Sequence, residues 1–463
     1  MQYISTRGSA PHLLFEEAML TGLARDGGLY VPQEIPQMSM GDIKALCGLS
    51  YEEVAFHVMR PYIGSTFGDE VFFDIINAAY KSFDHASRAP LVELENNHFL
   101  LELFHGPTLA FKDFAMQLIG QMFQVALNKR GERVTIVGAT SGDTGSAAIE
   151  AFGGLDAVDV FIMYPHGRVS EVQRRQMTTP THKNVHALAL DGHFDDCQAR
   201  LKDMFNDFKF RDRVRLAGIN SINWARILAQ VVYYFSSAVS LGAPDRSVSF
   251  TVPTGNFGDI FAGYIAKRMG LPIEDLVIAT NQNDILHRCL NSGEYRMNDV
   301  LPSYSPSMDI QISSNFERAL FDAYDRDGAA IAQLMEALRN NDGFSLSQGI
   351  LEKLQEHFSS NSVSEEDTLA CIRETKQKTG EILCPHSAIG VHVAERMRNK
   401  DVPSITLATA HPAKFPDAVE KACNLRPALP ERMANLFERE ERLSHVSNDL
   451  KEITSLVKDR IIS

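Results

Sequence analysis

The strongest constraint on the fold is an alternation of β-rich runs, glycine loops and helical runs that begins near residue 91. The run 133–138 (R-V-T-I-V-G) precedes A-T-S-G-D-T-G and a helical segment, and the run 247–252 precedes T-G-N-F-G-D and another helix. Further strands are predicted at 158–164, 185–190 and 404–407. Such alternation is typical of parallel βαβ units, whose ligand sites lie in the loops at the carboxyl ends of the strands. The sequence therefore predicts an α/β fold.

Helical patterns occupy both flanks of this α/β region. In residues 1–90, Ser50 and Glu53 form a capping-box pattern at the start of an amphipathic run. Residues 315–380 return to helical patterns, which we interpret as a helical insertion. We therefore expect a mostly helical N-terminal domain over 1–90 and a catalytic region over 91–463.

Composition excludes several classes of protein. The 463 residues are 44% hydrophobic and 22% charged, as in globular proteins, and a net charge of −14 argues against non-specific nucleic-acid binding. The six cysteines form no C-x-x-C pair, which favours reduced thiols in the cytoplasm and no zinc or other metal site. Since no apolar run approaches the length of a membrane span, we expect neither a membrane segment nor an export signal.

Two glycine loops are candidates for binding a ligand. In T-G-N-F-G-D (254–259), backbone N–H groups and a helix N-terminus would form an anion cup, although a tight turn that needs glycine fits equally well. In T-S-G-D-T-G (140–145), hydroxyl and N–H groups suit a carboxylate or phosphate, whereas Asp143 suits a ligand hydroxyl. A hydroxyl N-cap followed by a glycine turn is the structural alternative for this second loop.

A single lysine, Lys112, lies in the apolar stretch F-H-G-P-T-L-A-F-K-D-F. Apolar surroundings lower the pKa of a lysine and yield the free amine that Schiff-base chemistry requires. A salt bridge to Asp113 or a snorkelling surface lysine would explain the residue without chemistry. An amine combined with a phosphate cup is what pyridoxal phosphate requires, so the two features together favour that cofactor.

Four motifs in order resemble the threonine synthase family: H-G-P-T-L-A-F-K-D-F, A-T-S-G-D-T-G, T-G-N-F-G-D and T-A-H-P-A-K-F. S-T-R-G and G-L-A-R-D-G-G-L-Y-V-P near the N-terminus resemble its longer, yeast and enterobacterial form, so the resemblance runs to at least Phe415. It implies the fold type II architecture of pyridoxal-phosphate enzymes, with parallel sheets flanked by helices in a large domain and a small α/β subdomain at roughly 115–200. It also implies conversion of O-phospho-L-homoserine and water into L-threonine and phosphate.

The resemblance assigns roles to single residues. Lys112 would form the internal aldimine, Asp143 would lie beside the 3′-oxygen of the cofactor, and Thr409 would face its pyridine nitrogen. The cofactor phosphate would be bound by Gly255, Asn256, Phe257, Gly258 and Asp259. The substrate carboxylate would lie between Ser141 and Thr144. The substrate phosphate would be bound by Arg168, Ser170, Asn220, Asn223 and Arg226, with a salt bridge or a carbonyl cap as the alternative for Arg226.

Three other functions remain compatible with these residues. The nearest is another fold type II lyase, such as a serine/threonine dehydratase or a threonine-synthase-like phospho-lyase. A non-catalytic protein that keeps the fold is the second, and retention of Lys112 with the phosphate loop argues against it. A nucleotide-binding enzyme is disfavoured because neither glycine loop matches G-x-G-x-x-G or G-x-x-x-x-G-K-[ST]. We expect a monomer or homodimer.

Overall fold

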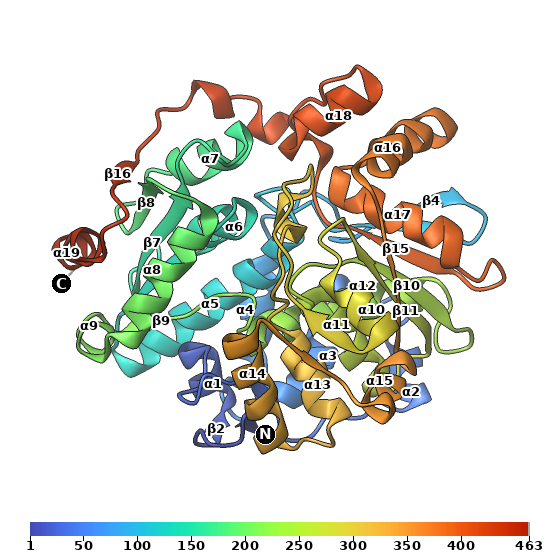
Figure 1. Ribbon diagram of the computed structural model, residues 1–463, viewed down its shortest axis with the longest axis horizontal. Coiled ribbons are helices and arrows are strands. Elements are labelled where there is room, and N and C mark those ends of the chain that lie inside the picture. Colours follow the sequence, from blue (N-terminus) through green and yellow to red (C-terminus); the bar gives the residue numbers. More distant parts are fainter. Residues whose placement is uncertain (462–463) are drawn as a thin grey trace.

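Two parallel sheets dominate the computed structural model, which describes residues 1–461 (Figure 1). The larger sheet has the strand order β14-β11-β10-β15-β5-β4, and every pair is parallel except β4 with β5. Its strands are β4 (Leu91–Glu95), β5 (His98–Glu102), β10 (Val248–Pro253), β11 (Ile273–Thr280), β14 (Phe358–Ser362) and β15 (Ser404–Ala408). The predicted α/β class is therefore confirmed.

The smaller sheet has the order β16-β8-β7-β6-β9 and is parallel throughout. Its strands are β6 (Val134–Ala139), β7 (Val158–Pro165), β8 (Val185–Leu190), β9 (Leu216–Ala217) and β16 (Ser444–Val446). The five strands predicted from the sequence are β6, β7 and β8 of this sheet and β10 and β15 of the larger one. Each is confirmed to within one residue at each end. The short edge strands β9 and β16 extend this sheet beyond the predicted subdomain at 115–200.

Helices cover both faces of the smaller sheet, because its strands alternate their side chains between two hydrophobic clusters. Ile136 and Ile162 pack into the main core of the protein, whereas Val137, Phe161 and Met163 pack into a separate cluster. The helices around this sheet are α5 (Lys112–Arg130), α6 (Asp143–Phe152), α7 (Glu171–Thr178), α8 (Phe194–Asn206), α9 (Phe208–Val214) and α19 (Leu450–Arg460). The C-terminal segment crosses from the larger sheet to reach β16 and α19 (Figure 1).

The N-terminal region shares the main core. It contains α1 (Phe15–Thr21), α2 (Met40–Ala45), α3 (Tyr51–Ile63) and α4 (Asp69–Tyr80), and an antiparallel sheet of β1 (Gln2–Ser5), β2 (Leu13–Leu14) and β3 (Tyr30–Pro32). The predicted capping box of Ser50 and Glu53 is confirmed at the start of α3. Tyr3 and Phe72 belong to the same hydrophobic cluster as Phe250 of β10, so this region packs as part of the catalytic body. A domain boundary at residue 90 stays a prediction.

The remaining helices belong to the larger sheet. They are α10 (Trp224–Ser240), α11 (Gly258–Arg268), α12 (Ile285–Ser292), α13 (Phe316–Ala323), α14 (Gly328–Asn341), α15 (Gln348–Gln355), α16 (Glu365–Thr379), α17 (Pro385–Met397) and α18 (Pro416–Cys423). None of the helices in residues 1–461 has the length and apolarity that crossing a membrane requires.

The segment 315–380 differs from a purely helical insertion. It contains the expected helices α13 to α16, but also β14, which pairs with β11 at the edge of the larger sheet. It contributes β13 (Gly343–Ser345) as well, which forms an antiparallel two-stranded sheet with β12 (Glu294–Arg296). The segment is therefore integral to the sheet that carries the glycine loop after β10.

Candidate active site

Lys112 is the first residue of α5 and follows a loop that is held rigidly. Ala110 forms a β-bridge with Ala410, which places the lysine beside the end of β15. Asp113 is fully buried, and its carboxylate accepts hydrogen bonds from Thr108 N–H (2.8 Å) and Thr108 Oγ1 (2.6 Å). These hydrogen bonds tie the first turn of α5 to Thr108 in the loop that precedes it. Lys112 forms an ion pair with a residue other than Asp113, namely an aspartate of α6.

That residue is Asp143, at the start of α6. Its Oδ2 lies 3.7 Å from Lys112 Nζ, and its Oδ1 lies 2.8 Å from Lys414 Nζ. Gln173 of α7 also donates to Oδ1 from its Nε2 at 2.8 Å. Gly142, with φ of 135°, passes so close to Gln173 that a Cβ there would lie 2.3 Å from the side-chain amide carbon. One carboxylate thus joins two buried lysines and a glutamine from three separate parts of the chain.

The electrostatics of this cluster favour a reactive amine. Burial lowers the pKa of Lys112 to about 8, and the nearby charges of Arg226 and Lys414 add to that effect, while Asp143 opposes it. Burial alone would raise the pKa of Asp143, but Lys414 and Lys112 hold it well below its ordinary value. The structure therefore places an ionised carboxylate beside an amine whose pKa, about 8, lies well below that of an ordinary lysine.

The loop after β10 has the geometry of an anion site. Phe257 has a left-handed backbone (φ 61°), and α11 begins at the next residue, Gly258. The loop carbonyls are fixed from outside, since Ser313 Oγ donates to Gly255 O (2.7 Å) and Asn315 N–H donates to Asn256 O (3.1 Å). The backbone N–H groups of 255–258 form no hydrogen bond within residues 1–461. Unpartnered N–H groups at a helix N-terminus are suited to a phosphate.

The side chain of Asp259, at the start of α11, bonds to α10 and not to this loop. Its Oδ1 accepts hydrogen bonds from the hydroxyls of Tyr233 (2.5 Å) and Tyr234 (3.1 Å) on α10. Burial raises the pKa of Asp259 to about 7, so the tyrosines hold a carboxyl group whose charge is disfavoured. Only its backbone N–H, in the first turn of α11, remains to face an anion.

Two of the residues expected to bind the substrate phosphate are helix caps. Asn223 is fully buried: its Oδ1 accepts from Ala225 N–H at the start of α10, and its Nδ2 donates to Met19 O (2.8 Å) and Gly218 O (3.1 Å). Ser170 caps α7 by accepting from Gln173 N–H at 3.2 Å. The hydrogen-bonding groups of Asn223 are used inside the chain, so its side chain has no donor left for a phosphate.

Arg226 remains a strong candidate for that phosphate. Its side chain is 2% exposed, and its one hydrogen bond within residues 1–461 is a long one to Ile219 O (3.4 Å). The buried Nε has no partner in the described chain, and burial lowers the pKa of Arg226 to about 10. A buried guanidinium without a carboxylate is costly unless a ligand supplies the negative charge.

The other expected substrate residues are less constrained. Arg168 is exposed and Asn220 half-buried, and neither side chain has a hydrogen bond or ion pair in residues 1–461. Ser141 and Thr144 flank Asp143, and their hydroxyls likewise have no hydrogen bond in the described chain. The helix start between them is capped by Thr140, whose Oγ1 accepts from Gly142 N–H and Gly145 N–H at 2.9 Å each.

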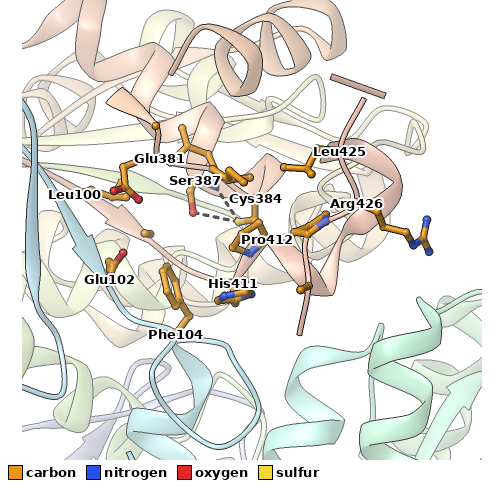
Figure 2. Close-up of a pocket in the computed structure, with 17 residues that line it drawn as sticks. Leu100, Glu102, Phe104, Glu381, Cys384, Ser387, His411, Pro412, Leu425 and Arg426 are labelled. Carbon is orange, nitrogen blue, oxygen red and sulfur yellow. Dashed lines mark hydrogen bonds between the residues drawn. The ribbon is translucent and has the colours of Figure 1, made fainter. Parts of the chain in front are cut away.

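Thr409 follows β15 and is buried beside the loop of Lys112. Its carbonyl accepts from Phe111 N–H (2.9 Å), and its N–H donates to Ser387 Oγ on α17 (3.2 Å). A pocket of about 470 Å³ opens on the other side of Ser387, and Figure 2 shows Cys384 and Ser387 lining it. Lys112 does not line this pocket, so the candidate site is identified by its chemistry and not by this pocket.

Four functional candidates escaped the sequence analysis. Lys414 stands in the quoted T-A-H-P-A-K-F motif without an assigned role, and Gln173 had only its helix-cap position as a signal. Asn315 donates from Nδ2 to both Asn256 O (3.0 Å) and Ser221 O (3.1 Å), which ties the glycine loop to the segment before α10. His386 is buried with neither ring nitrogen hydrogen-bonded in the described chain, and burial lowers its pKa to about 4.

Similarity to known proteins extends over nearly the whole chain. Family models described as "Threonine synthase N terminus", "Pyridoxal-phosphate dependent enzyme" and "Threonine synthase, C-terminal" match residues 2–80, 83–343 and 387–457. Threonine synthase of Pseudomonas aeruginosa is 54% identical over 459 residues, which cover 99% of this chain and 98% of that protein. The chain belongs to the threonine synthase family.

Solved structures of threonine synthases agree with this assignment. The pyridoxal-phosphate-bound enzyme from Brucella melitensis is 56% identical, has a TM-score of 0.97, and each chain covers 100% of the other. The yeast enzyme is 41% identical with a TM-score of 0.93, covering 99% of this chain and 98% of that one. The fold is that of fold type II enzymes, and the cofactor is pyridoxal phosphate. The free N–H groups after β10 and the buried amine of Lys112 fit that cofactor.

Proposed function

We propose that the cluster around Lys112 carries out the threonine synthase reaction, in which O-phospho-L-homoserine and water become L-threonine and phosphate. The observation that carries the proposal is a buried amine whose pKa is about 8, next to an ionised carboxylate, in a chain that follows threonine synthases over its whole length. Pyridoxal phosphate, when bound, supplies a conjugated system that accepts the electrons left when a proton leaves the substrate.

The cofactor would be held by residues of four separate segments. The N–H groups of 255–258 and the N-terminus of α11 would bind its phosphate, because they have no hydrogen-bond partner in the described part of the chain and carry partial positive charge. Lys112 would bind it covalently through Nζ. Asp143 and Thr409 would contact the polar atoms of the ring, Asp143 as an ionised acceptor and Thr409 as a neutral hydroxyl. A neutral hydroxyl at the pyridine nitrogen would leave that nitrogen less firmly protonated than a carboxylate would.

The amine of Lys112 would move protons on the substrate. A lysine whose pKa is about 8 is partly deprotonated near neutral pH, so it can accept the Cα proton and return a proton later. Ser141 and Thr144 would bind the substrate carboxylate, since their hydroxyls flank Asp143 and are free of protein partners within residues 1–461. This arrangement would hold Cα within reach of the amine.

The substrate phosphate would be bound by Arg226. Its guanidinium is buried, lacks a carboxylate partner in the described chain, and lies close enough to Lys112 to influence the charge of that amine. Burial strengthens a charge-assisted hydrogen bond to a phosphate. Asn220 would assist from the same segment. Arg168, which is exposed, would assist in binding the same phosphate.

The direct test is a product assay with the purified holoenzyme. Incubation with O-phospho-L-homoserine is expected to release threonine and inorganic phosphate in equal amounts, and Lys112→Ala is expected to abolish both. Release of phosphate with 2-oxobutyrate and ammonia in place of threonine would favour a lyase on the same fold. That distinction matters because a human protein named threonine synthase-like 2 is also 38% identical over 453 residues.

We also propose a cellular location and an oligomeric state. A cytoplasmic location is supported by the six unpaired cysteines, four of them buried. We propose a monomer or a homodimer, which light scattering of the purified protein at several concentrations would distinguish.

A further inference from the structure

A second buried lysine, Lys414, lies at the site without a role in the proposed reaction. It belongs to the short 3-10 helix Pro412–Lys414 after β15, and its side chain has no exposed surface. Its Nζ donates to Thr108 O at 2.8 Å and pairs with Asp143 Oδ1 at 2.8 Å. Burying an ammonium group completely is costly even when it is paired. A completely buried Lys414 and a largely buried Lys112 (11% exposed) around one carboxylate therefore call for a functional explanation.

The contacts of Lys414 fix the orientation of Asp143. Oδ1 of the carboxylate is bonded to both Lys414 Nζ and Gln173 Nε2, each at 2.8 Å, so rotation about the side-chain bond would break two strong contacts. The other oxygen, Oδ2, is then the one that faces Lys112, at 3.7 Å. Lys414 is itself held by the carbonyl of Thr108, whose hydroxyl and N–H are bound by Asp113.

Lys414 offsets the charge that Asp143 places beside Lys112. Asp143 contributes one negative charge and Lys414 one positive charge, so the pair as a whole is neutral. The other titratable groups acting on this cluster are Arg226 on α10, which is positive, His386 on α17 and His411 after β15, and Cys384 before α17. Burial lowers the pKa of both histidines to about 4, so they are uncharged at neutral pH, and burial raises the pKa of the Cys384 thiol. The charge of Lys414 also acts on Asp113. Asp113, on α5 itself, bonds Thr108 rather than either lysine.

We propose that Lys414 is a positioning residue that acts on Lys112 through Asp143: it fixes which carboxylate oxygen faces the amine and cancels the charge of that carboxylate. The inference deepens the proposed function and rests on Lys112 being the amine that carries the cofactor. Asp143 and Lys414 together then act on Lys112 as a single neutral hydrogen-bonding residue would. Removing either member changes the charge at Lys112, and removing both restores it.

The test follows the pH midpoint at which the long-wavelength absorbance of the cofactor on Lys112 is lost, in the purified holoenzyme. Lys414→Met leaves Asp143 as an uncancelled negative charge, so the midpoint is expected to rise by about 1–3 pH units. Asp143→Asn leaves Lys414 uncancelled, so the midpoint is expected to fall by a similar amount. The double variant is expected to return close to the wild-type midpoint, and Lys414→Arg to stay near it. Lys421→Met, which removes an exposed lysine on α18, is the matched control.

The outcomes separate positioning from a purely structural salt bridge. Midpoints that stay constant, or that move in the same direction in both single variants, would overturn the proposal, whatever happens to thermal stability. If Lys414→Met fails to fold, the double variant and Asp143→Asn still decide, because their predicted midpoints differ. Cofactor absorbance with no threonine produced would refute the proposed function alone, since the midpoint series needs no substrate.

Discussion

Replacing Lys112 by methionine is expected to stabilise the cofactor-free protein, because the wild-type chain keeps a charged amine where burial disfavours charge. Methionine has a similar length and no charge, so it fills the same space without the desolvation cost. Asp143 keeps its shorter contacts with Lys414 and Gln173 in the variant, so no unpaired carboxylate results. The residue proposed to be catalytic would thus reduce the stability of the protein that carries it.

The magnitude follows from the pKa of Lys112, which burial lowers from 10.5 to about 8. A lowering of about 2.5 pH units, at about 1.4 kcal/mol per unit, corresponds to about 3 kcal/mol. Because the folded-state pKa is lower than the unfolded one, the unfolded chain binds more protons between pH 8 and 10.5. The penalty is therefore complete below pH 8, declines as the pH rises, and vanishes above 10.5. At pH 9.5 about 1 kcal/mol of it remains.

Guanidinium unfolding of the cofactor-free wild type and Lys112→Met, at pH 7 and pH 9.5, measures this dependence. We expect the variant to be more stable by about 3 kcal/mol at pH 7 and by about 1 kcal/mol at pH 9.5. The gain from apolar packing of methionine is independent of pH, so the change between the two conditions isolates the charge. A variant that is less stable than the wild type at pH 7, or a difference that does not change with pH, would refute the reasoning.

Three further predictions concern the ligand-binding residues. Arg226→Met is expected to raise the KM for O-phosphohomoserine by about 10–100-fold, because the loss of a charge-assisted hydrogen bond costs about 1.5–3 kcal/mol; an unchanged KM would remove Arg226 from the phosphate site. Gly255→Ala would place a Cβ 2.8 Å from Ser307 O, so cofactor titration of the cofactor-free protein should show about tenfold or weaker binding; wild-type affinity would contradict the crowding. Asn315→Ala removes the side-chain hydrogen bond to the Asn256 carbonyl, keeps the one from the backbone N–H, and is expected to weaken cofactor binding by about 1–3 kcal/mol, while equal affinity would show that the backbone bond suffices to hold the loop.

The sequence was sufficient for the elements with a strong local pattern. Strands β6, β7, β8, β10 and β15 are apolar runs bounded by turn residues, and each was predicted to within one residue. The edge strand β14 is F-S-S-N-S, which has no apolar alternation and gains its structure from pairing with β11. Strand β16 spans three residues and pairs with β8, more than 250 positions earlier. No window of local sequence contains that information.

The candidate site shows the same division. Lys112 and the loop after β10 were found because each has an unusual composition within a few residues. Lys414 and His386 had no such signal, since their importance depends on which distant groups meet them. Asn223 shows the value of a local signal: an asparagine just before a helix is a preferred N-cap, and it caps α10 in the structure. A contact between Asn223 and the substrate phosphate stays a prediction from the resemblance.

The central claim is that the cofactor is bound covalently to Lys112, and borohydride trapping tests it most directly. Reduction of the holoenzyme makes the bond between cofactor and lysine permanent, and mass analysis of the digested protein then locates the modified residue. Lys414 pairs with Oδ1 of Asp143, whereas Lys112 faces Oδ2 of the same residue, so Lys414 is the natural internal control. The account predicts a pyridoxyl group on the peptide that contains Lys112 and none on the peptide that contains Lys414. A label on Lys414, or one spread over exposed lysines, would contradict it.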